Sequence, residues 1–261
     1  MNPLERRLRD LRAQGKKGFI GYLTAGDPSI AETLGLMEAL DRGGCDVIEV
    51  GIPFSDPLAD GPVIQAAGQR AIEKDLGVEE IFQVVRRFKE KSGTPLAFLV
   101  YTNTIVVYGK DEFMRACKEI GVDALIVPDL PYEEQGEIKA EADAAGIALI
   151  PFASPTSGDR LTYTLKEGEG FVYCVSSMGV TGRDSEFHKD LDKYIAAVKE
   201  NTDLPVAVGF GISTREDVVR MAGIADAVIV GTAIVRKIEE SKGNPFVVEA
   251  FVRELSSALE S

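Results

Sequence analysis

The chain has 261 residues, of which 45% are hydrophobic, as expected for a globular protein that buries a large core. No uninterrupted apolar stretch approaches the roughly 20 residues needed to span a bilayer, and the formal charge of -13 repels polyanions such as nucleic acids. Membrane-spanning and nucleic-acid-binding functions are therefore not expected, and the partner should be a small molecule or another protein.

Three cysteines, Cys45, Cys117 and Cys174, are scattered along the chain without a CxxC spacing. Neither a disulfide framework nor a zinc site is expected from such a pattern. The predicted compartment is a reducing cytoplasm.

The N-terminal segment, from about residue 2 to residue 14, is predicted to be an amphipathic helix. Leu4, Leu8 and Leu11 recur at helical spacing. The segment is rich in arginine like a transit peptide, but it also carries Glu5 and Asp10. We expect this helix to dock on the rest of the fold.

Eight short apolar runs follow, and longer amphipathic segments separate them. The runs are apolar on both faces, as parallel strands covered by helices must be. The expected strands are residues 18–26, 46–52, 95–101, 124–129, 148–154, 171–176, 205–211 and 226–232. This repeat of strand and helix, without a linker-like break, predicts an α/β fold with a single (β/α)8 TIM barrel over residues 1–261. An open doubly wound sheet is the alternative, but it would need fewer strands and a Gly-x-Gly-x-x-Gly after the first of them.

Two of the helix starts carry the pattern of a capping box. Ser29 precedes Glu32 by three residues, and Ser213 precedes Glu216 by the same spacing. Both pairs are predicted to cap the helices that follow the first and the seventh strand.

Chemistry in such a barrel sits at the C-terminal ends of the strands, where Glu49 is the strongest candidate. If Glu49 points into the barrel mouth, Ile48 and Val50 pack against the helices. Desolvation would then raise its pKa and keep a proton available near neutral pH. The alternative is a structural glutamate that is paired with an arginine or with backbone amides.

Other polar residues near strand ends are weaker candidates when taken singly. Asp27, Asp56 and Asp60 each lie beside a proline or glycine and are compatible with ordinary turns. Tyr173 lies within the sixth predicted strand and is also compatible with a core aromatic residue.

Glycine-rich segments end the seventh and eighth strands, GFGIS at 209–213 and VGTAIV at 230–235. Each is predicted to start a helix whose first amides lack internal partners, which favours binding of a phosphate group. A third segment, SSMGVTGRDSEF at 176–187, could close over a ligand as a lid through Gly179, Thr181 and Gly182. A merely flexible loop is the alternative.

Several kinds of catalysis lack the residues they need. No predicted strand end carries a lysine for a Schiff base, and the single histidine, His188, lies in the charged stretch FHKD. No dinucleotide fingerprint is present either. The remaining chemistry is acid/base catalysis by carboxyl groups on a phosphorylated substrate.

Six tracts together resemble the α-subunit family of tryptophan synthase over essentially the whole chain. They are TAGDP (24–28), EVGIPFSDPLADGPVIQ (49–65), PDLP (128–131), SSMGVTG (176–182), VGFGIS (208–213) and VGTAIV (230–235). The resemblance implies a carbon–carbon lyase of tryptophan biosynthesis that cleaves indole-3-glycerol phosphate to indole and glyceraldehyde 3-phosphate. It also implies transfer of the indole to a β subunit, within an α2β2 assembly under allosteric control.

The resemblance further implies a role for each matching residue. Glu49 would protonate the indole at C3, Asp60 would accept the indole N–H, and Tyr173 would support Glu49. The indole would be enclosed by Tyr22, Leu99, Ile126 and Phe210, and the phosphate would be held by Gly182, Gly211, Gly231 and Thr232. Thr181 would contact Asp60 when the lid closes. Partner contacts would fall at Pro53 to Asp56, Asn103 and Asp129.

By the same resemblance, this chain would carry no cofactor, no metal would be required, and pyridoxal phosphate would belong to the β subunit. Two rival functions stay open on the residues alone. One is an isomerase with another phosphate-binding barrel, and the other is an inactive barrel that acts only as an allosteric partner subunit.

Overall fold

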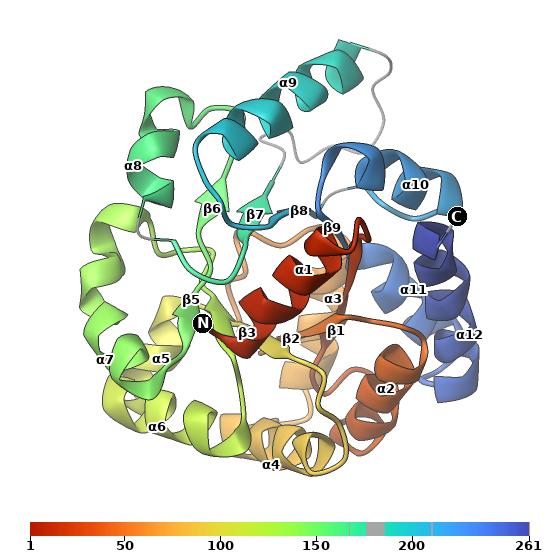
Figure 1. Cartoon of the computed structure of the whole chain (residues 1–261). Coiled ribbons are helices and arrows are strands. Elements are labelled where there is room, and N and C mark those ends of the chain that lie inside the picture. The colour runs from red at the N-terminus through yellow and green to blue at the C-terminus, as the bar shows by residue number, and fades with distance from the viewer. Residues whose placement is uncertain (167, 176–185, 210, 261) are drawn as a thin grey trace.

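The computed structural model of the chain describes residues 1–166, 168–175, 186–209 and 211–260 (Figure 1). Its strands form one parallel sheet in the order β5-β4-β3-β2-β1-β9-β8-β7-β6. The strands are β1 (Gly18–Thr24), β2 (Val47–Gly51), β3 (Leu96–Leu99), β4 (Ala124–Ile126), β5 (Ala148–Leu149), β6 (Phe152–Ala153), β7 (Val172–Cys174), β8 (Val206–Val208) and β9 (Ala227–Val230).

The two outermost strands of this order, β5 and β6, are parts of one predicted strand. Only Ile150 and Pro151 separate them in the chain. The N–H of Ile150 donates to the Leu125 carbonyl at 2.9 Å, and the Pro151 carbonyl accepts from the Tyr173 N–H at 2.9 Å. The same stretch therefore pairs on both sides and closes the sheet, which confirms the predicted eight-stranded barrel.

Helices surround the barrel, as Figure 1 shows. They are α1 (Pro3–Ala13), α2 (Ile30–Arg42), α3 (Pro62–Ile72), α4 (Val78–Lys89), α5 (Thr102–Tyr108), α6 (Lys110–Ile120), α7 (Lys139–Ala145), α8 (Leu161–Leu165), α9 (Glu186–Glu200), α10 (Arg215–Ile224), α11 (Thr232–Glu240) and α12 (Pro245–Ser256). Short 3-10 turns lie at Tyr132–Glu137, Gly158–Arg160 and Ser257–Glu260. Within the described residues, no helix has the length and apolar character needed to cross a membrane.

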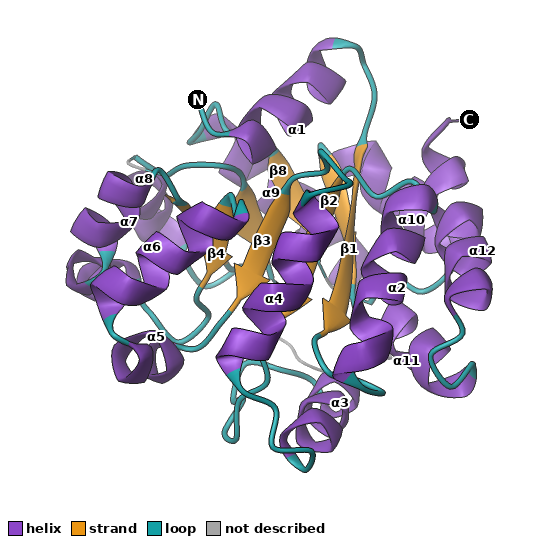
Figure 2. Ribbon diagram, turned by 90° about the horizontal axis from the view of Figure 1, so that it is seen from below, coloured by secondary structure: helices purple, strands orange, loops and turns teal. Residues whose placement is uncertain are grey.

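The N-terminal helix α1 closes one end of the barrel. Its Leu4, Leu8 and Leu11 are buried in the barrel interior with residues such as Ile20 of β1 and Phe171, which directly precedes β7. Glycine at position 18 leaves room for α1 at the start of β1, because a Cβ there would approach the Leu8 side chain to 2.6 Å. Figure 2 shows α1 at one end of the strands and α3 at the other end, toward which the strand arrows point. The C-terminal ends of the strands therefore form the mouth near α3, and the active site of such a barrel is expected there.

The two faces of each strand belong to different parts of the core. On β2, Val47 packs in the barrel interior, whereas Ile48 and Val50 pack in the layer between the strands and the helices. Glu49 follows the same alternation and therefore points inward. This arrangement is the predicted one.

Neither predicted capping box is formed. Ser29 is the N-cap of α2 but makes no side-chain capping bond; the Thr33 hydroxyl instead donates to the Ser29 carbonyl at 3.0 Å. At α10 the box uses Thr214 and Asp217, one residue beyond the predicted pair. A threonine and an aspartate satisfy the same backbone donors as a serine and a glutamate, so the pattern alone does not distinguish the two registers.

Asp27 lies in a turn after β1, as predicted, because its N–H donates to the Thr24 carbonyl at 3.4 Å. Its carboxylate also forms an ion pair that the sequence did not predict. Asp27 is 3% exposed. Arg70 of α3 donates to both of its carboxylate oxygens at 2.8 Å, and the same guanidinium contacts Glu239 of α11 at 2.9 Å. The pair joins the first strand loop to the helix that follows Asp60.

We expect Asp27→Asn to lower the free energy of unfolding by about 2 kcal/mol, because it removes the buried, bidentate partner of Arg70 and leaves the guanidinium with the more exposed Glu239. Denaturation in urea with an unchanged m-value measures the effect. The control is Asp10→Asn, which changes an exposed carboxylate on α1. Equal stabilities of the two variants would contradict a structural role for the pair.

Candidate active site

Glu49 lies on β2 at the mouth of the barrel and is 1% exposed. Its neighbours in register are Tyr22 on β1 and Ala97 on β3. The Oε2 atom has no hydrogen-bond partner within the described part of the chain. Burial, and secondly the charge of Asp60, raise the pKa of Glu49 to about 8. The predicted desolvation of this carboxyl group is therefore confirmed, and it holds a proton at neutral pH.

Asp60 is carried by the loop between β2 and α3. The Tyr101 hydroxyl donates to its Oδ2 at 3.2 Å. Burial raises the pKa of Asp60 to about 6, and the hydrogen bond from Tyr101 opposes that rise. Asp56 of the same loop is exposed, and its carboxylate accepts from the Ser55 hydroxyl at 3.2 Å. Of these two aspartates, Asp60 is therefore the one whose charge acts on Glu49.

Two tyrosines flank the glutamate. Tyr22 is buried, and its hydroxyl lies 3.1 Å from the Thr24 hydroxyl. Burial, followed by the charge of Glu49, raises the pKa of Tyr173. Glycine is required opposite each ring, because a Cβ at Gly51 would overlap Tyr22 and a Cβ at Gly209 would lie 2.7 Å from Tyr173. Both hydroxyls stay protonated and can act as hydrogen-bond donors.

The residues expected to enclose an aromatic ring lie close to these groups. Leu99 and Ile126 are adjacent in register on β3 and β4. Tyr22 and Leu99 belong to one apolar cluster with residues of α3 and α11, namely Val63, Ile64, Ala67 and Val235. Phe210, the fourth expected wall residue, lies outside the described residues.

The predicted phosphate site is only partly formed as expected. Gly231 is the N-cap of α11, which starts at Thr232 with no side-chain cap among the described contacts. Its first amides are therefore available to an anion. At α10 the N–H groups of Ser213 and Thr214 already donate to Asp217, at 3.0 and 2.9 Å. These two N–H groups precede the helix; within its first turn, the Asp217 N–H donates to the Thr214 hydroxyl at 3.2 Å, so the capping box satisfies one of the amides that were expected to lack a partner.

The remaining glycine of this region, Gly211, is exposed and has a φ of +66°. This left-handed conformation favours glycine. No described heavy atom lies within 4 Å of the position that a Cβ would occupy there. The lid residues Gly179, Thr181 and Gly182 lie outside the described residues, as does the side chain of His188. No group of three histidine, cysteine or acidic side chains is placed to hold a metal ion in the described ranges.

Comparison with known proteins shows the family. The model of the family "Tryptophan synthase alpha chain" matches residues 8–260. The chain belongs to the tryptophan synthase α chain family. It is similar to the tryptophan synthase α chain of Thermoanaerobacter sp. (strain X514), with 43% identity over 99% of this chain and 100% of the relative. The α chain of Clostridium kluyveri (strain NBRC 12016) is 39% identical over the full length of both.

Solved structures agree with this family assignment. Tryptophan synthase subunit α from Legionella pneumophila superposes with a TM-score of 0.91 at 34% identity, covering 100% of this chain and 99% of the other. A Mycobacterium tuberculosis tryptophan synthase chain gives 0.91 at 33% identity over 99% and 98%. As a tryptophan synthase α chain, the protein is a carbon–carbon lyase that converts indole-3-glycerol phosphate to indole in tryptophan biosynthesis.

The rim of this α-chain barrel carries the residues expected at a subunit contact. Asp56, Asn103 and Asp129 are exposed, and Pro53 is half-buried. Asp129 also has a local role, because it accepts hydrogen bonds from the Thr102 N–H at 2.9 Å and the Thr102 hydroxyl at 3.0 Å. It therefore holds the first turn of α5 as well as facing solvent.

Sequence reasoning missed other residues of this α-chain rim. Leu58 is 93% exposed and Val107 is 78% exposed. Val107 belongs to the apolar stretch TIVVY, which is typical of a buried segment, so the pattern did not mark it as surface. Tyr101 was not singled out either, although it ends the third predicted strand, where functional residues of a barrel lie.

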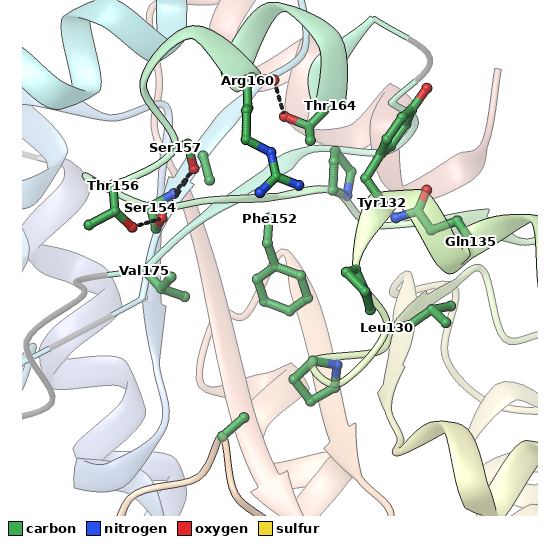
Figure 3. A pocket seen from close by; sticks show the side chains of 15 residues that line it. Leu130, Tyr132, Gln135, Phe152, Ser154, Thr156, Ser157, Arg160, Thr164 and Val175 are labelled. Atoms are coloured by element: carbon green, nitrogen blue, oxygen red, sulfur yellow. Dashed lines mark hydrogen bonds between the residues drawn. The ribbon is translucent and has the colours of Figure 1, made fainter.

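A cavity of about 450 Å³ opens beside Asp60, and Figure 3 shows the side chains that line it. Its lining includes Ala59, Pro128, Phe152, Arg160 and Val175. The Arg160 side chain points toward Phe152 in this view, and the Phe152 ring lies 5.3 Å from the ring of Tyr173. The cavity therefore lies next to the neighbours of Asp60 and Tyr173, and its lining does not include Glu49, Asp60 or Tyr173 themselves.

Proposed function

We propose that Glu49 and Asp60 together catalyse the cleavage of indole-3-glycerol phosphate in this chain. The observation that carries the proposal is a buried glutamate at the barrel mouth whose Oε2 has no hydrogen-bond partner among the described residues, and on which the charge of Asp60 acts. The pKa of Asp60, about 6, is below that of Glu49, about 8. An acid and an anion held side by side match the two charges that the reaction develops.

The substrate itself has to accept the electrons of the breaking bond, because no lysine that could form a Schiff base is among the proposed site residues. The indole ring can do so once it is protonated at C3. Glu49 gives its proton to C3 of the indole, and positive charge develops at the ring nitrogen. Asp60 accepts the hydrogen bond of that N–H, which strengthens as the charge grows. The Glu49 carboxylate then takes the proton of the hydroxyl on the adjacent carbon. The bond from C3 to that carbon breaks, its electrons return to the ring, and indole and glyceraldehyde 3-phosphate leave.

The other site residues bind and orient the substrate in this proposal. Tyr173 supports Glu49 with its hydroxyl, and Thr181 contacts Asp60 from the lid. The indole ring lies among Tyr22, Leu99, Ile126 and Phe210, and the phosphate is held by Gly182, Gly211, Gly231 and Thr232. The uncapped start of α11 supports the phosphate assignment at Gly231 and Thr232.

One assay tests the proposal and both rivals. Indole-3-glycerol phosphate is supplied with and without a tryptophan synthase β subunit, and indole is measured. An isomerase with another substrate forms no indole, and an inactive partner subunit binds but does not turn over. Absence of indole under both conditions would overturn the proposed function.

We infer that the partner is a tryptophan synthase β subunit in an α2β2 assembly, with pyridoxal phosphate in the β subunit and no cofactor in this chain. Pro53, Asp56, Asn103 and Asp129 form the contact. Exposed apolar side chains at the same rim, Leu58 and Val107, support an interface there. Three free, buried cysteines support a reducing, cytoplasmic location.

We expect Val107→Lys to weaken binding of the β subunit about tenfold or more, because it places a charge in a contact that excludes water. Indole formation by the isolated chain should not change. Titration calorimetry with the β subunit measures the affinity. The control is Val219→Lys on α10, another exposed valine (51%) that is not on the rim. Equal affinities of the two variants would place the interface elsewhere.

A further inference from the structure

Tyr101 connects the candidate catalytic aspartate to the rest of the barrel mouth. Its hydroxyl donates to Oδ2 of Asp60 at 3.2 Å and accepts from the Ala59 N–H at 3.2 Å. The two hydrogen bonds hold consecutive residues of one turn. The tyrosine is 2% exposed, whereas Asp60 is half-buried and Ala59 is exposed, so the two bonds are partly shielded from water.

The turn itself is otherwise held through its backbone. The Asp60 N–H donates to the Pro57 carbonyl at 3.0 Å, and the Gln65 side chain donates to the Asp60 carbonyl at 2.9 Å. These contacts place the main chain but leave the carboxylate free to rotate. Within the described residues, the hydrogen bond that orients the carboxylate comes from Tyr101.

Tyr101 is fixed in turn by two segments of the rim. Its ring stacks on Phe54, with ring centroids 4.8 Å apart and an angle of 16° between the planes. The next residue, Thr102, is held by the Asp129 carboxylate through its N–H and its hydroxyl. Phe54 and Asp129 therefore restrict Tyr101 from its ring side and its backbone side.

We propose that Tyr101 is the positioning residue of Asp60, and that Asp129 and Phe54 on the rim set the position of Tyr101. The proposal rests on the proposed role of Asp60 in the reaction. It connects the rim of the barrel to Asp60 by two routes: from Phe54 through the stacked ring of Tyr101, and from Asp129 through Thr102 and the backbone of Tyr101.

The charged groups around Asp60 determine how its pKa changes when the hydrogen bond from Tyr101 is lost. Asp60 interacts electrostatically with Glu49 and with the hydroxyls of Tyr22, Tyr101 and Tyr173, and Asp129 acts on Tyr101. The Tyr101 bond lowers the pKa of Asp60. Its removal therefore favours the protonated aspartate and moves the acid limb of the rate profile to higher pH.

The test is Tyr101→Phe, which keeps the ring and its stacking on Phe54 but removes the hydroxyl. We expect kcat/KM to fall about tenfold, mainly through kcat, and the acid limb to rise by about half a pH unit or more. The affinity for glycerol 3-phosphate, which probes the phosphate end, should stay within about twofold. The matched control is Tyr108→Phe on α5, whose hydroxyl bonds to Glu79 at 2.5 Å, away from Asp60.

The outcomes separate this proposal from the proposed function. If Asp60→Asn is slow while Tyr101→Phe has the rate and the pH profile of the unmodified chain, the positioning role is overturned and the function stands. If Asp60→Asn is itself as fast as the unmodified chain, the role of Asp60 fails, and with it the proposal.

The rim connection is tested with Asp129→Ala in the isolated chain. We expect a fall of about threefold in kcat/KM alone, and no further fall when the change is added to Tyr101→Phe, because both act through the same contact. Independent, multiplicative losses would overturn the connection between Asp129 and Asp60.

Discussion

Replacing Glu49 by glutamine is expected to reduce indole formation by about a thousandfold, since the amide cannot deliver a proton to C3 of the indole or receive one from the hydroxyl. Steady-state rates with indole-3-glycerol phosphate at pH 7 measure the loss. Because the substitution preserves the shape of the side chain, KM should change far less than kcat. A variant with near-normal turnover would remove Glu49 from the mechanism.

The same substitution is expected to change the pH dependence of stability. The pKa of Glu49 is raised from its ordinary value of 4.5 to about 8 in the folded chain. Between these values the folded state binds a proton that the unfolded state has lost, so Glu49 makes the folded chain progressively less stable as pH rises from about 4.5 to 8. Glutamine does not titrate, so the variant should not show this decrease in stability with pH.

Thermal unfolding of both forms between pH 5 and pH 8.5 measures the difference. The Tm of Glu49→Gln relative to the unmodified chain should increase with pH across this range. A fixed cost of burying the amide shifts all points equally and does not affect the slope. A difference in Tm that is independent of pH would show that Glu49 is not desolvated in the folded state.

The second large effect is expected for Asp60→Asn, with a loss of about a hundredfold in kcat/KM, because an amide oxygen stabilises the developing positive charge less than a carboxylate does. The activity of the unmodified chain should be bell-shaped in pH. Its acid limb near 6 reports ionisation of Asp60, and its basic limb near 8 reports loss of the Glu49 proton.

In the asparagine variant the acid limb near pH 6 should disappear. The basic limb should move below pH 8, because the charge of Asp60 is one of the two causes that raise the pKa of Glu49. Full pH profiles of kcat/KM for both forms provide the measurement. An unchanged basic limb would mean that the two carboxyl groups do not interact.

The barrel and the position of Glu49 were predictable from the sequence for a physical reason. Parallel strands that are covered on both sides must be apolar on both faces, so a glutamate among Val47, Ile48 and Val50 is anomalous without any alignment. The alternation of side chains along a strand then predicts that the Glu49 side chain points into the barrel. Both features depend on residues close together in the chain.

Contacts between segments far apart in the chain were not predictable in this way. The ion pair of Asp27 with Arg70 joins positions 43 residues apart, and the hydrogen bond of Tyr101 to Asp60 joins positions 41 residues apart. Whether Asp56 or Asp60 turns toward Glu49 depends on the path of one loop, which contains Pro53 and Pro57 but no periodic pattern. The family resemblance supplied that choice, and the geometry of Asp60 agrees with it.

The strand that closes the barrel at Ile150 and Pro151 also divides the molecule into two pieces. Every described strand pair except β1 with β9 lies wholly before or wholly after this point. The first piece holds Glu49 and Asp60, and the second holds Tyr173, Gly211 and Gly231. The proposed acid/base pair and most of the proposed phosphate cradle thus belong to separate halves, and formation of indole by two co-expressed fragments would report directly on their reassembly.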